Sequence, residues 1–112
     1  MPRNMSFSLT TGQIRTRSKT VTRRLGWWDI LPGEIVNACV KCQGLKKGER
    51  IDVLGQIRIL STRMEPLDYI TAQDLIREGF PDSTCADFIN MFIKANRCGP
   101  KTTVNRIEFE YI

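Results

Sequence analysis

The sequence predicts a small α+β domain: a partly open, mixed β-barrel of about five strands, with two or three short helices packed across it. The chain has 112 residues, which fit a single domain over residues 1–112 and leave no room for two. Its hydrophobic content of 41% permits a true core. Apolar and polar residues alternate near both ends of the chain, whereas helical spacing occurs between residues 71 and 96.

The first half of the chain predicts three strands and one short helix. The helix covers residues 10–17 and is weakened by Gly12. A turn over residues 31–34, which reads Leu-Pro-Gly-Glu, leads into the last of these strands. The strands are expected at residues 5–9, around residues 20–22, and at residues 35–41.

The middle of the chain predicts a basic loop followed by a long strand. The loop covers residues 44–49 and the strand covers residues 51–61. Gly55 within the strand indicates a bulge or a sharp barrel corner. One face of this strand is expected to carry Val53, Ile57 and Ile59.

Two helices and a closing strand follow. Thr71 is a predicted N-cap, and its helix runs to Glu78 before Gly79 ends it. A second helix begins after Asp82 or Ser83. Its apolar stripe is interpreted as core packing and contains Phe88, Met91, Phe92 and Ala95. The closing strand over 104–112 is expected to turn Ile107, Phe109 and Tyr111 inward and Glu108 and Glu110 outward.

Positive charge is concentrated in the first half of the chain. Residues 1–63 carry a net charge of +8, whereas residues 64–112 carry −3. The densest run contains Arg15, Arg17, Lys19, Arg23 and Arg24. This asymmetry favours a basic surface that faces an anionic partner, although a basic run by itself is equally compatible with a solvated face.

No segment predicts a membrane span or an exported protein. No run approaches the ~20 apolar residues that a membrane helix needs. Residues 1–10 lack the apolar core of a secretory signal, so we expect a cytoplasmic protein with no membrane partner. The pattern leaves the oligomeric state open, with a monomer allowed.

The four cysteines are expected to be reduced thiols rather than metal ligands. Cys39 and Cys42 have the spacing of half a zinc site, but Cys85 and Cys98 are separated by twelve residues. The alternation of Val36, Ala38 and Val40 also indicates a strand leading up to this pair, and positions three apart on a strand point to opposite faces. The sequence therefore predicts neither a metal nor another cofactor, and zinc is the weaker alternative.

The chain contains no histidine, which restricts any catalytic mechanism. Ser-His-Asp and Cys-His catalysis are excluded, together with histidine-based zinc hydrolases. A general base must then be a lysine, a carboxylate, a tyrosine or a thiolate. Neighbouring arginines would lower the pKa of Lys19, and a lysine tuned in this way can deprotonate a threonine hydroxyl. The alternative is a solvent-facing basic strand whose threonines only reflect β-propensity.

Two adjacent tryptophans follow this basic segment. Trp27 and Trp28 are expected to divide between the core and the rim of the fold. A rim tryptophan beside basic residues can stack on a base, and plain packing is the alternative.

The segment Arg17-Ser18-Lys19-Thr20-Val21-Thr22-Arg23-Arg24, followed by Leu31-Pro32-Gly33-Glu34-Ile35-Val36, resembles the signature of ASCH domains. The order of the later elements is also similar, so the resemblance covers nearly the whole chain from about Phe7. It is similar to small ASCH proteins of bacterial and phage genomes. The resemblance implies a PUA-like β-barrel with a cleft for RNA or a modified nucleoside.

One branch of that family consists of amidohydrolases that remove the acetyl group from N4-acetylcytidine. The resemblance places the lysine, threonine and glutamate of that branch at Lys19, Thr22 and Glu78. Thr22 would then attack the acyl carbonyl while Lys19 accepts its proton, and Glu78 would protonate the leaving amine or position Lys19. Binding of the RNA or nucleoside is expected from Arg17, Thr20, Arg23, Arg24, Trp27 and Trp28, with Arg23 or Arg24 stabilising the oxyanion.

Several features depart from that branch. They are the two tryptophans, the Lys46-Lys47 loop, the Gly79-Phe80-Pro81 turn, and Arg17-Ser18 where the family often has Gly-Arg. Two alternatives therefore stay open beside the amidohydrolase. The first is a non-catalytic RNA-binding module, and the second is a ribonuclease that uses Lys19 and Glu78.

Overall fold

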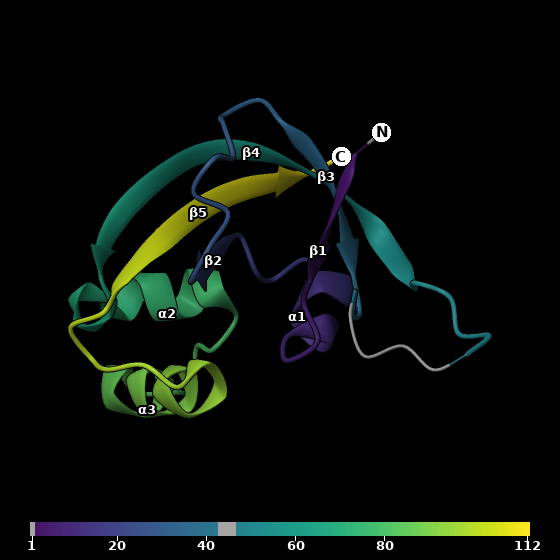
Figure 1. Cartoon of the computed structure of the whole chain (residues 1–112). Coiled ribbons are helices and arrows are strands. Elements are labelled where there is room, and N and C mark those ends of the chain that lie inside the picture. The colour runs from purple at the N-terminus through teal and green to yellow at the C-terminus, as the bar shows by residue number, and fades with distance from the viewer. Residues whose placement is uncertain (1, 43–46) are drawn as a thin grey trace.

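The computed structural model describes residues 2–42 and 47–112, so the predicted basic loop over residues 44–49, including Lys46, lies partly outside the described residues. The described part of the chain forms five strands, three α-helices and one short 3-10 helix (Figure 1). The strands are β1 (Arg3–Ser6), β2 (Val21–Arg24), β3 (Ile35–Cys39), β4 (Val53–Pro66) and β5 (Thr103–Tyr111). The helices are α1 (Thr11–Arg15), the 3-10 helix η1 (Leu67–Tyr69), α2 (Ala72–Glu78) and α3 (Cys85–Asn96).

The strands form one mixed sheet in the order β1-β3-β4-β5-β2. Strand β1 pairs with β3 in parallel, and the other three pairs are antiparallel. Because β1 and β2 are the two edges, the sheet is not closed into a barrel. In Figure 1 the long strands β4 and β5 arch over α2 and α3. The predicted α+β class, with about five strands and two or three helices, is confirmed.

A bulge interrupts the pairing of β3 with β4. Ala38 pairs with Gly55, whereas Cys39 pairs with Val53, so Leu54 is the extra residue. The prediction of a bulge near Gly55 was therefore correct, but the predicted face of Val53 was wrong. Ile57 is fully buried, whereas Val53 is 49% exposed because the extra residue reverses the alternation between them.

The caps of α2 agree with the sequence pattern, and the cap of α3 does not. The Thr71 hydroxyl accepts a hydrogen bond from the backbone N–H of Asp74 at 3.2 Å, and Gly79 ends the helix in the left-handed region with φ 92°. Helix α3 is capped by Thr84, not by Asp82 or Ser83. The backbone N–H of Ser83 donates to the carbonyl of Phe80, so the turn that follows α2 extends through Ser83 and delays the second helix.

The apolar interior consists of two clusters. The first cluster contains Met5, Phe7, Ile14, Ile30, Val36, Ala38, Ile57, Ile59, Ile107 and Phe109. The second cluster contains Leu67, Ile70, Leu75, Phe88, Phe92 and Val104. Along β5, buried Arg106 separates Val104 of the second cluster from Ile107 of the first. No helix within residues 2–42 and 47–112 is long and apolar enough to cross a membrane.

Candidate functional site

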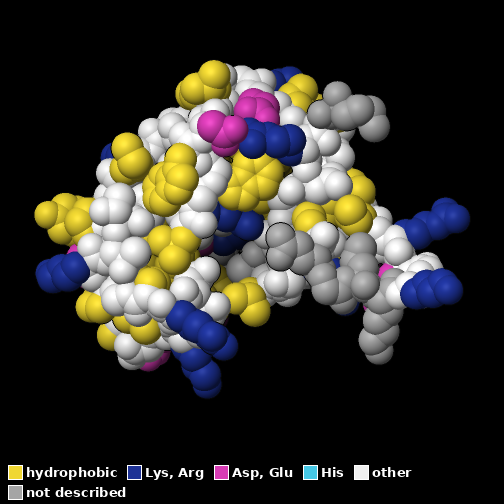
Figure 2. Space-filling view, in the orientation of Figure 1, with side chains coloured by type: hydrophobic (Ala, Val, Ile, Leu, Met, Phe, Trp, Pro, Cys, Tyr) yellow, Lys and Arg dark blue, Asp and Glu magenta, His cyan; other side chains and the backbone are white. Residues whose placement is uncertain are grey.

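A pocket of about 390 Å³ opens beside β2, between the segment that follows β1 and the face of α3. Figure 2 shows a hollow near the centre of this face, with Lys or Arg side chains inside it and hydrophobic side chains around it. Six of the nine predicted site residues line the pocket, together with apolar side chains of α3. They are Lys19, Thr22, Arg23, Arg24, Trp27 and Glu78.

Of these six residues, Thr22, Arg23 and Arg24 belong to β2, whereas α2 contributes Glu78. The remaining lining residues were not predicted as a site. They include the backbone segment from Ser6 to Thr10 and the face of α3 that carries Phe88, Met91, Phe92 and Ala95. Phe88 and Phe92 are buried, which confirms their predicted packing role, whereas Met91 is half-buried and Ala95 is exposed at the pocket wall.

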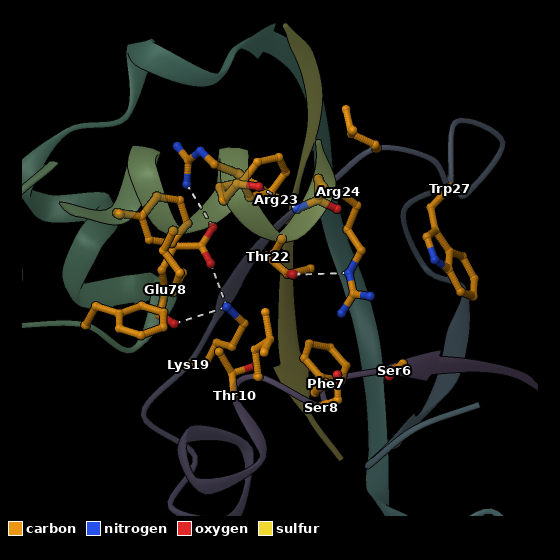
Figure 3. A pocket seen from close by; sticks show the side chains of 18 residues that line it. Ser6, Phe7, Ser8, Thr10, Lys19, Thr22, Arg23, Arg24, Trp27 and Glu78 are labelled. Carbon is orange, nitrogen blue, oxygen red and sulfur yellow. Dashed lines mark hydrogen bonds and ion pairs between the residues drawn. The ribbon is translucent and has the colours of Figure 1, made fainter. Parts of the chain in front are cut away.

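Lys19 and Glu78 form a buried ion pair at one side of this pocket (Figure 3). Lys19 Nζ donates to Glu78 Oε1 at 2.6 Å and to the Glu78 carbonyl oxygen at 3.1 Å. Both residues are 2% exposed. The carboxylate charge and the two oxygen acceptors of Glu78 together fix the position of the Lys19 amine.

The surrounding structure lowers the pKa of Lys19. Burial is the largest cause, because it disfavours the charged ammonium, and the charges of Arg24 and Arg23 act in the same direction. The Glu78 carboxylate opposes them by charge and by hydrogen bonding. The crowding by arginines expected from the sequence therefore operates, but burial is the stronger effect.

Hydrogen bonds to the backbone explain how Lys19 and Glu78, which are 59 positions apart in the sequence, come together. The Thr20 N–H donates to the Arg77 carbonyl at 2.7 Å, and the Tyr111 hydroxyl donates to the Lys19 carbonyl. Gly79 permits a close approach from the side of α1, since a Cβ there would lie 2.5 Å from Gln13 Cγ. These contacts fix the end of α2 against the start of β2, and with it Glu78 against Lys19.

Thr22 and Arg24 lie on the same strand and point into the pocket (Figure 3). Arg24 Nε donates to Thr22 Oγ1 at 3.2 Å, so the threonine accepts and its own hydroxyl proton remains available. The Arg24 guanidinium lies 4.6 Å from the centre of the Phe7 ring. Burial lowers the pKa of Arg24 to about 10, against the raising effect of Glu78.

Arg23 differs from Arg24 because carboxylates engage it on several sides. Its guanidinium donates to Glu78 Oε2 at 3.1 Å, to Glu65 Oε2 at 3.3 Å, and to Asp74 Oδ2. The side chain is fully buried. Arg23 is therefore committed to this network, whereas no ion pair to Arg24 occurs among the described residues.

The network continues away from the pocket through Asp74. Arg106 donates to both Asp74 oxygens at 2.9 Å, and Arg77 donates to Oδ1 at 3.1 Å. These hydrogen bonds, first of all those from Arg106, hold the pKa of Asp74 well below its usual range. None of Asp74, Glu65 and Arg106 is among the site residues predicted from the sequence.

Three residues predicted to bind RNA or a nucleoside lie outside the pocket. Arg17 is exposed, and its guanidinium lies 5.5 Å from the centre of the Tyr111 ring. Its φ of 60° lies in the left-handed region, at the turn between α1 and Lys19. Thr20 is half-buried and its backbone bridges to α2 and β5, while Trp28 is 54% exposed and does not line the pocket.

The expected division into a core and a rim tryptophan occurs only in part, because Trp27 packs against the first apolar cluster without being fully buried. Trp27 lines the pocket and is half-buried, and Trp28 is the exposed partner. Arg3 packs its guanidinium 4.7 Å from the centre of the Trp27 ring and pairs with Asp29 and Glu34. Asn105 Nδ2 donates to the Trp27 carbonyl at 2.9 Å, so the segment that carries Trp27 is fixed from two strands.

The four cysteines are free thiols, and the described residues contain no group of three or more Cys, Asp, Glu or His side chains arranged to hold a metal ion. Cys39 is buried, and its thiol donates to the Asn37 carbonyl at 3.6 Å. Burial, with the neighbouring Cys42, raises the pKa of Cys39 to about 11. Cys39 is thus a protonated thiol at neutral pH.

No family model matches the chain, and no curated protein matches it. Among solved structures, the crystal structure of protein EF3133 from Enterococcus faecalis V583, described with the family model DUF984, is similar. The TM-score is 0.68, the match covers 100% of this chain and 77% of that one, and the sequence identity is 17%. At this identity the similarity shows a shared fold.

Proposed function

We propose that the chain is an ASCH-type protein that binds a pyrimidine nucleoside in this pocket and hydrolyses the amide of an N4-acylated cytidine. The observation that carries the proposal is the buried amine of Lys19, paired with Glu78 and lining the same pocket as Thr22. A buried lysine with a lowered pKa is a rare feature in a small domain, and such groups occur most often at functional sites.

The size and walls of the pocket support a nucleoside ligand. Its volume of about 390 Å³ lies at the lower end of the range for small-molecule sites. Phe7, Trp27 and Phe80 line it, and flat apolar side chains of this kind can pack against a base or a sugar. Polar groups of β2 occupy the remaining wall, where they can meet an acylated amine.

The proposed chemistry begins with the Thr22 hydroxyl. The lowered pKa of Lys19 increases the fraction of neutral amine, and in that form Lys19 accepts the hydroxyl proton while Thr22 Oγ1 attacks the acyl carbonyl carbon. The amide C–N bond then breaks, the proton returns from the Lys19 ammonium to N4 of the cytosine, and the acyl group stays on Thr22 as an ester. Water hydrolyses this ester to the free carboxylic acid and restores the hydroxyl.

Two neighbours have supporting roles in this scheme. Glu78 accepts hydrogen bonds from Lys19 and Arg23, which favours a positioning role for its carboxylate over direct proton transfer to the leaving amine. Arg24 is the better candidate for stabilising the oxyanion, because Arg23 is held by Glu65, Asp74 and Glu78. One well-placed donor of this kind is worth about 3–4 kcal/mol.

Recognition of a nucleoside without catalysis is the second candidate, and one observation favours it. Lys19 Nζ is engaged with Glu78, and Thr22 Oγ1 is engaged with Arg24. Among the described hydrogen bonds, none joins the Lys19 amine to the Thr22 hydroxyl. Catalysis therefore requires that substrate binding brings these two groups into contact, as catalytic hydrogen bonds often do.

The test is incubation of the purified protein with N4-acetylcytidine, with release of cytidine followed by chromatography. We expect turnover by the parent protein and a loss of at least about a hundredfold in Lys19→Met and in Thr22→Val, which removes the hydroxyl and keeps the shape. Lys101→Met is the matched control, because Lys101 is an exposed lysine paired with Asp68. Full turnover by Lys19→Met would exclude the scheme, and tight nucleoside binding without turnover would favour the second candidate.

A cytoplasmic location belongs to the same proposal. The four cysteines are free, which agrees with a reducing compartment. In the cytoplasm the protein would also encounter nucleosides released from RNA.

A further inference from the structure

A second pocket, of about 460 Å³, lies where β4 passes into η1 and α2 begins. Three arginines line it: Arg63 of β4, Arg77 of α2 and Arg106 of β5. Its residues are distinct from those of the nucleoside pocket, and none of the groups in the proposed mechanism lines it.

The two carboxylates at this pocket are already engaged. Arg63 Nε donates to Glu65 Oε1 at 2.7 Å, and the other Glu65 oxygen accepts from Arg23. Both oxygens of Asp74 accept from Arg106, and one of them accepts from Arg77 as well. Glu65 and Asp74 therefore serve as anchors that fix the guanidinium groups.

The arginines retain donors that these anchors do not use. A guanidinium has five N–H donors. In the hydrogen bonds of the described residues, Arg63 and Arg77 each donate through one nitrogen, and Arg106 donates through two. The side chain of Arg106 is 9% exposed, so an N–H there has little access to water. The side chains of Arg63 and Arg77 are 61% and 45% exposed, so their remaining donors can reach a ligand from solvent. This pocket thus holds more guanidinium donors than its two carboxylates engage.

The charge balance points the same way. The charged lining side chains, three guanidinium groups and two carboxylates, sum to one positive charge, which attracts a phosphate group, whether a strand diester or a monoester of about two negative charges. Planar guanidinium groups match phosphate oxygens in pairs of parallel hydrogen bonds.

Exposed apolar side chains lie beside these donors. Tyr69 is 66% exposed and Met64 is 69% exposed, and both line the pocket. Large side chains that remain exposed next to an anion site are typical of positions where a base stacks. A bare phosphate would leave this part of the pocket empty, whereas a nucleotide would cover it.

We propose that this second pocket binds the phosphate group of a ribonucleotide through Arg63, Arg77 and Arg106, with the adjoining base against Tyr69. The choice of a ribonucleotide rests on the proposed function, but the contacts are made by other residues. The phosphate belongs either to a free nucleotide or to an RNA strand, and both present the same oxyanion.

The first experiment measures binding of cytidine, cytidine 5′-monophosphate and inorganic phosphate by calorimetry. We expect the monophosphate to bind at least about tenfold more tightly than cytidine, and this advantage to disappear in Arg63→Gln/Arg77→Gln. Arg58→Gln is the matched control, because Arg58 is an exposed arginine of β4 paired with Glu110 outside both pockets. Equal binding of cytidine and its monophosphate would overturn the proposal, as would an undiminished advantage in the double variant.

Tyr69→Leu supplies a second variant that leaves the ion pairs intact. It should weaken binding of the monophosphate and leave binding of inorganic phosphate unchanged, since only the base contacts Tyr69. An equal loss for both probes would contradict the assigned base position.

A short single-stranded oligoribonucleotide identifies the source of the phosphate. If the strand binds through this pocket, the slope of log affinity against log salt should fall by about 1.4 in the double arginine variant, at about 0.7 per lost contact. If the free nucleotide is the ligand, the strand binds no more tightly than the monophosphate, and both bind through the same arginines. Repeating the measurement in Lys19→Met separates the two sites, because phosphate binding should persist there even if N4-acetylcytidine is not turned over.

Discussion

The same sheet buries two different kinds of side chain, apolar ones beside α1 and charged ones beside α2. Around α1 the sheet buries apolar side chains, among them Phe7, Ile57 and Phe109. Along α2, strands β2 and β5 bury the charged residues Arg23 and Arg106 against Glu78 and Asp74. Both regions exclude water. Burial by itself stabilises the apolar region, whereas burial of the charged side chains costs free energy that their ion pairs must offset.

The cluster of Arg23, Arg106, Glu78 and Asp74, called the ionic region below, is the part of the fold where burial costs free energy. Removing a charged group from water costs several kcal/mol, and the attraction of its partner returns this cost only where the hydrogen bonds are complete. In the ionic region nearly every carboxylate oxygen is engaged, so the cost is largely offset. Replacement of a buried ion pair by apolar side chains of similar volume is often neutral or stabilising, which favours a functional reason for the charges.

Arg23→Ala is the variant expected to have the largest effect. It leaves Glu65, Asp74 and Glu78 without a shared buried partner, so we expect a loss of about 3–5 kcal/mol in the free energy of unfolding. Urea denaturation measures it. Arg58→Ala breaks an exposed pair with Glu110 and should cost less than about 1 kcal/mol. Equal costs for the two variants would remove the distinction between the two regions.

Acid should weaken the ionic region before the apolar one. The pKa of Asp74 is lower in the folded chain than the unfolded value of about 3.9, so the folded state binds fewer protons. Its contribution to stability is complete above about pH 4 and is lost as the pH falls toward the folded pKa. Unfolding free energies measured from pH 7 to pH 3 should fall less steeply in Asp74→Asn. A slope identical to that of the parent would contradict the assigned role.

Ile59→Val should have the smallest effect on function. Ile59 is 1% exposed in the apolar region, and loss of one methylene there costs about 0.5–1.5 kcal/mol. Because Ile59 itself does not line the nucleoside pocket, turnover and ligand affinity should stay at parental values below the melting temperature. Thermal unfolding and a parallel turnover assay check both parts, and lost activity in a folded variant would show that the regions are coupled.

Local signals made much of this architecture predictable. Thr71 and Gly79 define α2 by cap chemistry that acts within a few residues, and so they place Glu78 at its last turn. The motif around Lys19 and Thr22 identified the strand that lines the pocket. Both predictions depend on neighbours in the sequence.

The contacts of the ionic region could not be predicted from neighbours in the sequence. Glu65 and Arg106 meet Arg23 and Asp74 only because β4, β5 and β2 bring distant segments together, and each residue alone has the appearance of a solvated strand position. The errors at Val53 and at the cap of α3 have a similar origin. In β4 a single bulge residue reverses which face Val53 occupies. Before α3 an added turn moves the start of the helix by one or two residues.

The double variant Lys19→Met/Glu78→Leu tests the central claim most directly, through its free energy of unfolding measured beside nucleoside turnover. The charged pair is replaced by apolar side chains of similar size, while Arg23 keeps Glu65 and Asp74 as partners. If the pair is maintained for chemistry, the double variant should be as stable as the parent or more stable, and inactive. A loss of more than about 3 kcal/mol would show instead that Lys19 and Glu78 act as a structural brace.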